Sequence, residues 1–127
     1  MQRSILSVGA VLYEVLNQEL KGTVTKVFPV VTDEAELPYV CYRRESIETL
    51  LTKPGLSADT AMVSIACFAA TYGESVMLAE KVRSIIDNKQ WTSAIVPLVL
   101  RSCYLCDAKE EWADDAYIQT LYFKIKA

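Results

Sequence analysis

Two cysteines three positions apart, Cys103 and Cys106, form the one motif in this sequence that is associated with chemistry. In redox proteins, the first cysteine of such a C-x-x-C pair lies at a helix N-terminus, which lowers the pKa of its thiol. Here the pair lies inside a segment with the pattern of a β-strand. Because residues three apart on a strand point to opposite faces, we expect the two thiols not to meet.

A structural zinc site would need two ligands in addition to this pair. Cys41 and Cys67 are the remaining cysteines, and each comes singly from a different predicted strand. In a chain without an export signal, cysteines are expected to stay reduced and to pack as small apolar groups. We therefore expect no metal and no cofactor. A small cytosolic redox or zinc-binding module that uses Cys103 and Cys106 is the alternative from another functional class.

The sequence contains no histidine. This removes the commonest general base, the partner of serine and cysteine nucleophiles, and the commonest metal ligand. The acidic residues cluster in predicted polar turns, at 33–36 and 110–115, where nothing would raise the pKa of a carboxyl group. There is no glycine-rich phosphate loop. We therefore expect no enzymatic activity.

The balance of charge argues against nucleic acid as a partner. The net charge is −3, and the longest basic feature is the pair Arg43-Arg44, whose side chains should point to opposite faces of a strand. Nucleic-acid binders normally carry a basic patch, so we expect no tight binding of DNA or RNA. No apolar run reaches the roughly 18 residues of a membrane span, and no signal segment is recognisable. We expect a cytosolic protein, or one that is assembled in a cytosol.

The length and the apolar content suit a single domain over residues 1–127, because 52% of the residues are hydrophobic. Apolar residues recur at helical spacing over 3–20 and again over 74–88. Strand patterns cover five further segments: 26–31, 38–50, 59–70, 97–107 and 116–126. Pro29 should confine the first strand to a sheet edge. We predict an α+β fold in the order α-β-β-β-α-β-β, with two helices on one face of a mainly antiparallel sheet of four to five strands.

The sheet face opposite the helices is predicted to be unusually apolar. A sheet covered by helices on one face normally carries polar residues on the other, and a large exposed apolar surface usually marks a partner site. The hairpin around Pro54-Gly55 adds leucines at its tip. We therefore predict a self-association surface made of the following residues: Leu50, Leu51, Leu56, Met62, Phe68, Ile118 and Tyr122.

Two tryptophans, Trp91 and Trp112, lie in predicted connecting segments. Each is interpreted either as the edge of the core under a loop or as an interface anchor, a role in which tryptophan is enriched. The sequence pattern does not decide between the two.

Several of these segments together resemble a known family. A Val-Phe-Pro strand at 27–29 follows the first helix, and Leu-Pro-Tyr-Val at 37–40 follows after an acidic gap. A strand over 62–69 runs into Thr-Tyr-Gly-Glu-Ser and a helix with Ala-Glu-Lys-Val-Arg, and the last hairpin ends in Leu-Tyr-Phe-Lys-Ile. Over nearly its whole length the chain is similar to the phage tail-completion, or tail-terminator, family related to the minor tail protein U of lambdoid phages.

The resemblance implies a virion structural protein without a catalytic signature. Such proteins form a ring, commonly a hexamer, that caps the finished tail tube of a phage or prophage and presents a surface for joining the head. The implied partners are further copies of the chain, the tail-tube protein and the head–tail connector proteins, with assembly in the cytoplasm of a bacterial host. Another head–tail connector or neck adaptor protein would follow the same logic and is kept as an alternative. The four cysteines and the leucine-rich hairpin tip depart from the family pattern, which leaves the ring contacts open.

Overall fold

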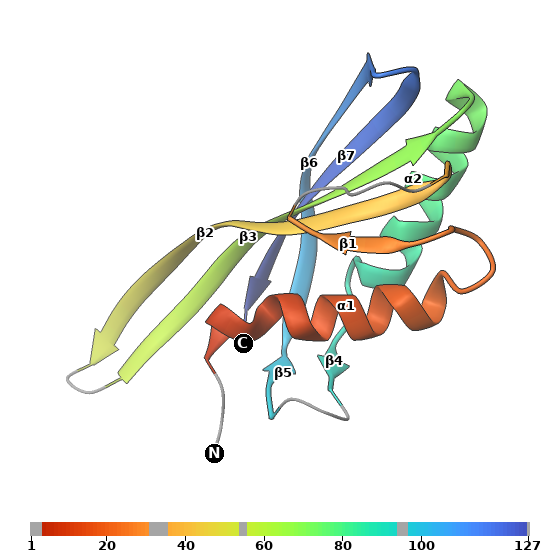
Figure 1. Ribbon diagram of the computed structural model, residues 1–127. Helices are drawn as coiled ribbons and strands as arrows, with labels where there is room; N and C mark the ends of the chain where they lie inside the picture. The colour runs from red at the N-terminus through yellow and green to blue at the C-terminus, as the bar shows by residue number, and fades with distance from the viewer. Residues whose placement is uncertain (1–3, 31–35, 54–55, 94–96, 127) are drawn as a thin grey trace.

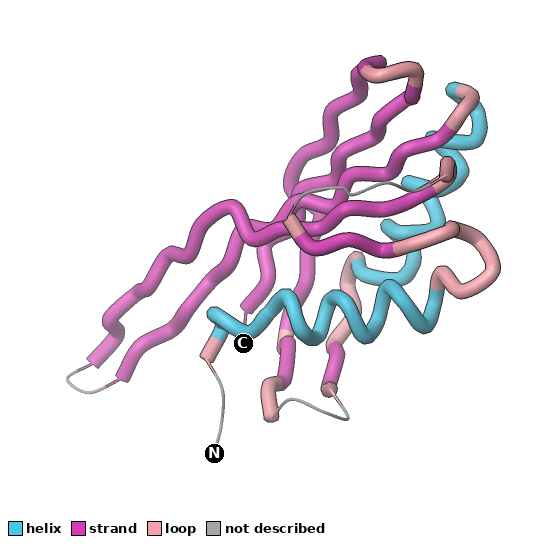
Figure 2. Tube along the Cα trace, in the orientation of Figure 1, coloured by secondary structure: helices cyan, strands magenta, loops and turns pink. Residues whose placement is uncertain are grey.

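The computed structural model describes residues 4–30, 36–53, 56–93 and 97–126, with the side chains of 49–58 outside the description. The chain forms two α-helices and a large sheet, which confirms the predicted α+β class (Figures 1 and 2). The elements are η1 (Ile5–Ser7), α1 (Val8–Glu19), β1 (Val27–Pro29), β2 (Tyr39–Lys53), β3 (Leu56–Ala69), α2 (Tyr72–Ile86), β4 (Trp91–Thr92), β5 (Val99–Leu100), β6 (Ser102–Ala113) and β7 (Ala116–Lys126). Apart from the short β4 and β5, this is the predicted order.

The main sheet has five strands in the order β1-β2-β3-β7-β6. All neighbouring strands are antiparallel except β1 and β2, which run parallel with Val27 opposite Val40. The sheet is therefore mixed, although mainly antiparallel as predicted. Pro29 ends β1 at the sheet edge, where its missing N–H costs no ladder hydrogen bond, so this prediction is confirmed.

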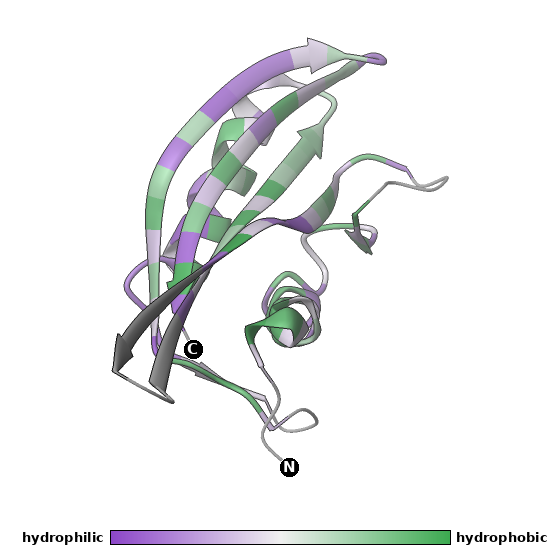
Figure 3. Ribbon diagram, turned by 90° about the vertical axis from the view of Figure 1, so that its left-hand side faces the viewer, coloured by the Kyte–Doolittle hydropathy of each residue, from purple (hydrophilic) through white to green (hydrophobic). Residues whose placement is uncertain are grey.

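Both helices pack on one face of the sheet, called here the inner face. Alternate residues of each strand point to that face, and Figure 3 shows the resulting alternation of hydropathy along the strands. Val63 and Ile65 on β3 and Phe123 on β7 are completely buried there. The helices contribute these buried side chains: Val8, Val11, Leu12, Val15, Leu16, Leu78, Ala79, Val82, Ile85 and Ile86. Full burial of an aliphatic or aromatic side chain of this size contributes about 1.5–3 kcal/mol, so this single core dominates the stability of the fold.

Helix α2 begins and ends at residues that satisfy its free backbone groups. The Thr71 hydroxyl accepts a hydrogen bond from the N–H of Glu74 at 3.2 Å, and the Glu74 carboxylate lies in the first turn, where it suits the helix dipole. The N–H of Asp87 closes the last turn by donating to Arg83. In the described part of the chain, neither helix is long and apolar enough to cross a membrane.

The C-terminal half departs from the sequence-based prediction in two places. The predicted strand over 97–107 divides into β5, which pairs with β4 in a separate two-stranded sheet, and β6. The acidic stretch 109–115 was predicted as a connecting loop, but β6 continues to Ala113 and only Asp114 and Asp115, both with positive φ, form the turn. The prediction was wrong because an exposed edge strand tolerates a run of charged side chains as readily as a loop does.

Candidate functional site: the outer face of the sheet

The sheet face turned away from the helices, called here the outer face, is the candidate interaction surface. It is formed by Tyr39, Cys41 and Arg43 on β2, by Met62, Ser64, Ala66 and Phe68 on β3, and by Ile118, Thr120 and Tyr122 on β7. The predicted residues Met62, Phe68, Ile118 and Tyr122 all belong to this face. The antiparallel register places Phe68 opposite Ile118 and Ser64 opposite Tyr122, so side chains far apart in the sequence become neighbours.

Aromatic rings cover part of this apolar surface themselves. The ring of Tyr39 stacks on Phe68 with a centroid distance of 4.7 Å, and Phe28 meets Tyr39 edge to face at 5.7 Å. Ile118, opposite Phe68 in the strand register, is only 7% exposed, and Phe68 is half-buried. Ring stacking between neighbouring strands thus removes part of the apolar area of the outer face from water within the monomer.

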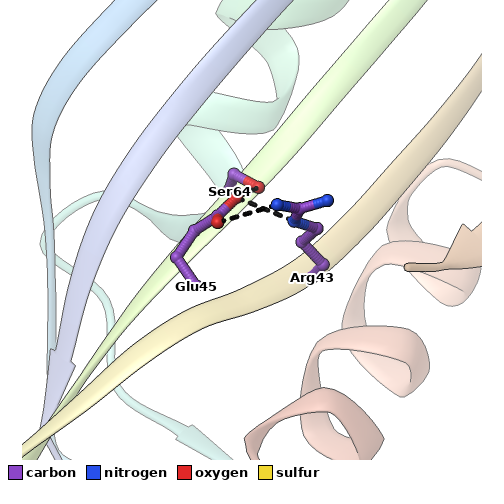
Figure 4. A network of polar contacts seen from close by, with 3 residues as sticks. All are labelled: Arg43, Glu45 and Ser64. Atoms are coloured by element: carbon purple, nitrogen blue, oxygen red, sulfur yellow. Dashed lines mark hydrogen bonds and ion pairs between the residues drawn. The ribbon is translucent and has the colours of Figure 1, made fainter. Parts of the chain in front are cut away.

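A polar network lies in the middle of the outer face and was not predicted from the sequence (Figure 4). Arg43 donates two hydrogen bonds to the Glu45 carboxylate, from Nε at 2.9 Å and from Nη2 at 3.1 Å. The buried Ser64 hydroxyl donates to the same carboxylate at 2.7 Å. These hydrogen bonds, first those from Arg43 and then that from Ser64, hold the pKa of Glu45 below its ordinary value. Glu45 lies at a β-bulge and has no partner on β3. In the sequence, the only indication of the Arg43–Glu45 ion pair is that the two residues are two positions apart.

The network lines a hollow of about 430 Å³ that opens to solvent on the outer face. The wall residues are Val30, Cys41, Arg43, Glu45, Ser64, Ala66, Phe68, Thr120 and Tyr122. Burial raises the pKa of the Cys41 thiol, with nearby Arg43 opposing the rise, so Cys41 presents a neutral thiol to the hollow at neutral pH. The hollow therefore offers apolar wall residues and one ion pair, in which the charge of Arg43 is paired with that of Glu45.

The two arginines of the basic pair separate as predicted. Arg43 lies on the outer face, whereas Arg44 donates a hydrogen bond to the carbonyl oxygen of Leu6 in η1 at 2.9 Å. The pair therefore forms no continuous basic patch.

The cysteine pair also behaves as its strand position predicts. Cys103 is buried in the core between the sheet and the helices, whereas Cys106 is exposed with its Sγ 3.5 Å from the Sδ of Met62 on the outer face. Burial raises the pKa of the Cys103 thiol to about 11 and that of Cys67 to about 12, so neither is an activated nucleophile. Among the described residues, no group of three or more histidine, cysteine or acidic side chains could hold a metal ion. This geometry gives no support to the alternative of a redox or zinc module.

The hairpin formed by β2 and β3 projects beyond the rest of the sheet (Figure 1). Strand β7 pairs with β3 only from Thr60 onward, so residues 49–53 and 56–59, called here the hairpin arm, pair only with each other. Leu50 lies opposite Ala58, and Leu56 lies opposite Lys53. The predicted interface residues Leu50, Leu51 and Leu56 belong to the segment whose side chains the structure does not describe.

The two tryptophans take different roles. Trp91 in β4 is half-buried and packs against the core, whereas Trp112 near the end of β6 is 60% exposed. The position of Trp91 agrees with the first interpretation, a residue at the edge of the core. The exposure of Trp112 agrees with the second interpretation, an interface anchor.

No protein-family model matches the chain, and no curated protein sequence matches it. Among solved structures, a chain from the virion of a native gene transfer agent particle is similar to this chain, with a TM-score of 0.65 and 14% sequence identity. The similarity covers 94% of this chain and 96% of that chain. At this identity the similarity shows a shared fold.

Proposed function

We propose that this protein is a structural component of a phage-like virion. The observation that carries the proposal is the similarity of the fold, over 94% of this chain, to a chain of the virion of a gene transfer agent. Because the two chains correspond over nearly their entire lengths, the similarity concerns a complete building block and not a common supersecondary motif. The outer face, with its apolar wall and neutralised ion pair, adds a surface suited to contacts between subunits.

Within the virion we assign the protein to the tail terminus. The order of its elements and its strand motifs resemble the tail-terminator family, whose members form rings, commonly hexamers. In this role the ring caps the tail tube and offers a joining surface to the head–tail connector proteins, after assembly in the bacterial cytoplasm. The proposal includes no catalytic reaction and no cofactor.

A ring needs a heterologous interface, in which two different patches of one subunit meet on neighbouring subunits. The hairpin arm is one candidate patch, because no other strand in the described part of the chain pairs with it. An isolated two-stranded hairpin is only marginally stable in water, so packing on a neighbour would stabilise it. The outer face with its hollow is the second patch. We therefore propose that the arm of one subunit packs on the outer face of the next, where each buried leucine would contribute about 1.5–3 kcal/mol.

The ring is tested by measuring the mass of the purified protein by sedimentation and by imaging it in negative stain. The parent protein should form closed rings, and the double variant Leu50→Asp with Leu51→Asp should remain a folded monomer, because charged side chains cannot enter an apolar interface without a partner. The variant Asn17→Asp with Gln18→Asp adds the same charge on the exposed side of α1 and should assemble like the parent. A parent protein that stays monomeric at high concentration, even with tail-tube tips present, would contradict the ring, and an arm variant that sediments like the parent would contradict this interface.

The position of the ring is tested by mixing the protein with purified tail tubes and, separately, with head–tail connector complexes. A terminator should bind the tube tips and stop their further polymerisation before any head is present. Binding to connectors without binding to tube tips would identify the protein as another neck component of the same virion.

A further inference from the structure

A second surface lies at the end of the molecule where the β6–β7 turn and the start of α2 come together, away from the hairpin arm (Figure 1). Three aromatic residues form it, and we call it the aromatic end: Tyr72, Trp112 and Tyr117. Trp112 lies opposite Tyr117 in the strand register, and the ring of Tyr72 meets that of Tyr117 edge to face at 5.9 Å. Tyr72 is 50% exposed and Trp112 is 60% exposed, so the cluster presents aromatic area to solvent.

Hydrogen bonds hold Tyr72, one of the three residues of the aromatic end, in place. The Tyr72 hydroxyl donates to Oε2 of Glu110 at 2.8 Å, and Nε2 of Gln119 donates to the same oxygen at 3.2 Å. Nε2 of Gln119 also lies 3.3 Å from Oγ of Ser75, which in turn donates to the Tyr72 carbonyl at 2.7 Å. These hydrogen bonds fix the first turn of α2 to strands β6 and β7. A surface that is already ordered loses little side-chain entropy when a partner binds.

The two segments that form the aromatic end carry acidic residues and no basic ones. Residues 70–79 and 110–123 contain no lysine or arginine. Among their acidic residues, Glu111 lies opposite Ile118 and belongs to the outer face, and the others are Glu74, Glu110, Asp114 and Asp115. The nearest lysine along β6, Lys109, points to the outer face, where its Nζ lies 5.4 Å from the ring centroid of Tyr122. Aromatic rings and carboxylates thus share this surface without a cation to neutralise them within these two segments.

We infer that the aromatic end docks a lysine- or arginine-rich segment of another protein. The faces of tryptophan and tyrosine rings attract cations, and the surrounding carboxylates add hydrogen-bonded charge pairs. Tryptophan, tyrosine and arginine are also enriched among the few residues that dominate binding at protein interfaces. The same acidic surface repels phosphate groups, which excludes a nucleic acid or an anionic lipid as the occupant. The surface shares no residue with the hairpin arm or the outer face, so its test is independent of ring formation.

Binding of a hexa-arginine peptide, followed by chemical-shift changes of the backbone amides, tests this inference. The shifts should concentrate at residues 72–75 and 110–119, and the affinity should fall as salt is added. Trp112→Ala should weaken binding at least fivefold. Asp114→Asn with Asp115→Asn should weaken it at least fivefold while keeping the turn, because asparagine tolerates the positive φ of both positions. The matched control Glu19→Gln with Glu80→Gln removes the same charge from exposed helix positions and should change the affinity less than twofold.

Three outcomes would overturn the inference. If the turn variant and the control weakened binding of the peptide equally, the peptide would be attracted by the overall negative charge of the protein and not by a defined site. Shifts centred on the outer face would place the cation elsewhere. If Trp112→Ala abolished self-association of the protein, the occupant of the aromatic end would be a second copy of this chain and not a basic partner.

Discussion

The Oδ1 atom of Asp87 accepts a hydrogen bond from the backbone N–H of Leu105 at 2.9 Å. Asp87 is the C-terminal cap of α2, and Leu105 lies directly before the bulge in β6, so one carboxylate ties the end of a helix to the edge strand of the sheet. The other oxygen of the same carboxylate accepts from Nε of Arg83 at 3.2 Å. The hydrogen bond from Leu105, with a smaller contribution from Arg83, lowers the pKa of Asp87. At neutral pH the ionised carboxylate of Asp87 therefore accepts the hydrogen bond from Leu105.

Replacement of Asp87 by alanine should lower the free energy of unfolding by about 1–2 kcal/mol, because the part-buried N–H of Leu105 loses its acceptor. Arg83→Ala is the matched control. It removes only a half-exposed ion pair and should cost less than about 1 kcal/mol. Urea titrations followed by circular dichroism give both values. Equal and small losses would show that the Leu105 hydrogen bond does not anchor the helix.

The stability of the fold should depend on the Glu45 carboxylate in the acid range. The hydrogen bonds from Arg43 and Ser64 hold the pKa of Glu45 below 4.5, the ordinary value to which it returns on unfolding. At a pH between the folded pKa of Glu45 and its ordinary pKa, the unfolded chain therefore binds more protons than the folded protein. The stabilisation that the charged carboxylate contributes is complete above the ordinary pKa and is lost as the pH falls through the folded pKa. Glu45→Gln should destabilise the protein at neutral pH by less than about 1 kcal/mol, because Arg43 is half-exposed and its charge is screened.

The same variant should become as stable as the parent at a pH below the folded pKa of Glu45, where the carboxyl group of the parent is protonated. Thermal unfolding across this pH range measures the convergence, with Glu19→Gln as a control on the exposed side of α1. A constant difference between Glu45→Gln and the parent at every pH would mean that the charge of Glu45 contributes nothing.

The two cysteines of the C-x-x-C pair should respond differently to substitution. Cys103→Ser should cost roughly 1–3 kcal/mol, because it places a hydroxyl group in the apolar core, whereas Cys106→Ser at an exposed site should change stability by less than about 0.5 kcal/mol. In the native protein, Cys106 should react fastest with a thiol reagent. The double variant should still assemble. Stoichiometric zinc in the purified protein that is lost in the double variant would contradict these expectations.

The protein should bind duplex DNA negligibly at near-physiological salt. Phosphate contacts from lysine and arginine supply the affinity of most DNA-binding proteins, and here the one basic pair is split between two faces of β2. Gel-shift assays with the parent and with Arg43→Ala should both show no complex. A sub-micromolar dissociation constant would contradict the expectation.

Local patterns in the sequence were sufficient to predict both helices and the faces of the central strands. Helical spacing of apolar residues identified both helices, and strand alternation assigned Met62, Phe68, Ile118 and Tyr122 to the face opposite the helices, where the register places them. Pro29 identified the edge strand, because a missing N–H is a property of the residue itself. The opposite orientations of Cys103 and Cys106 followed from the period of a strand. These features depend on neighbours within a few residues.

Only the tertiary structure decided which strands pair and in which register. The parallel pairing of β1 with β2, the bulges at Glu45 and Cys106 and the extension of β6 to Ala113 all depend on partners distant in the sequence. The candidate surfaces also depend on tertiary structure. Ser64 on β3 donates to the Glu45 carboxylate on the neighbouring strand β2, and the ring of Tyr72 on α2 contacts that of Tyr117 on β7. A strand carries its alternation in its own residues, but its register is set by the free energy of packing the whole sheet against the helices, to which every strand contributes.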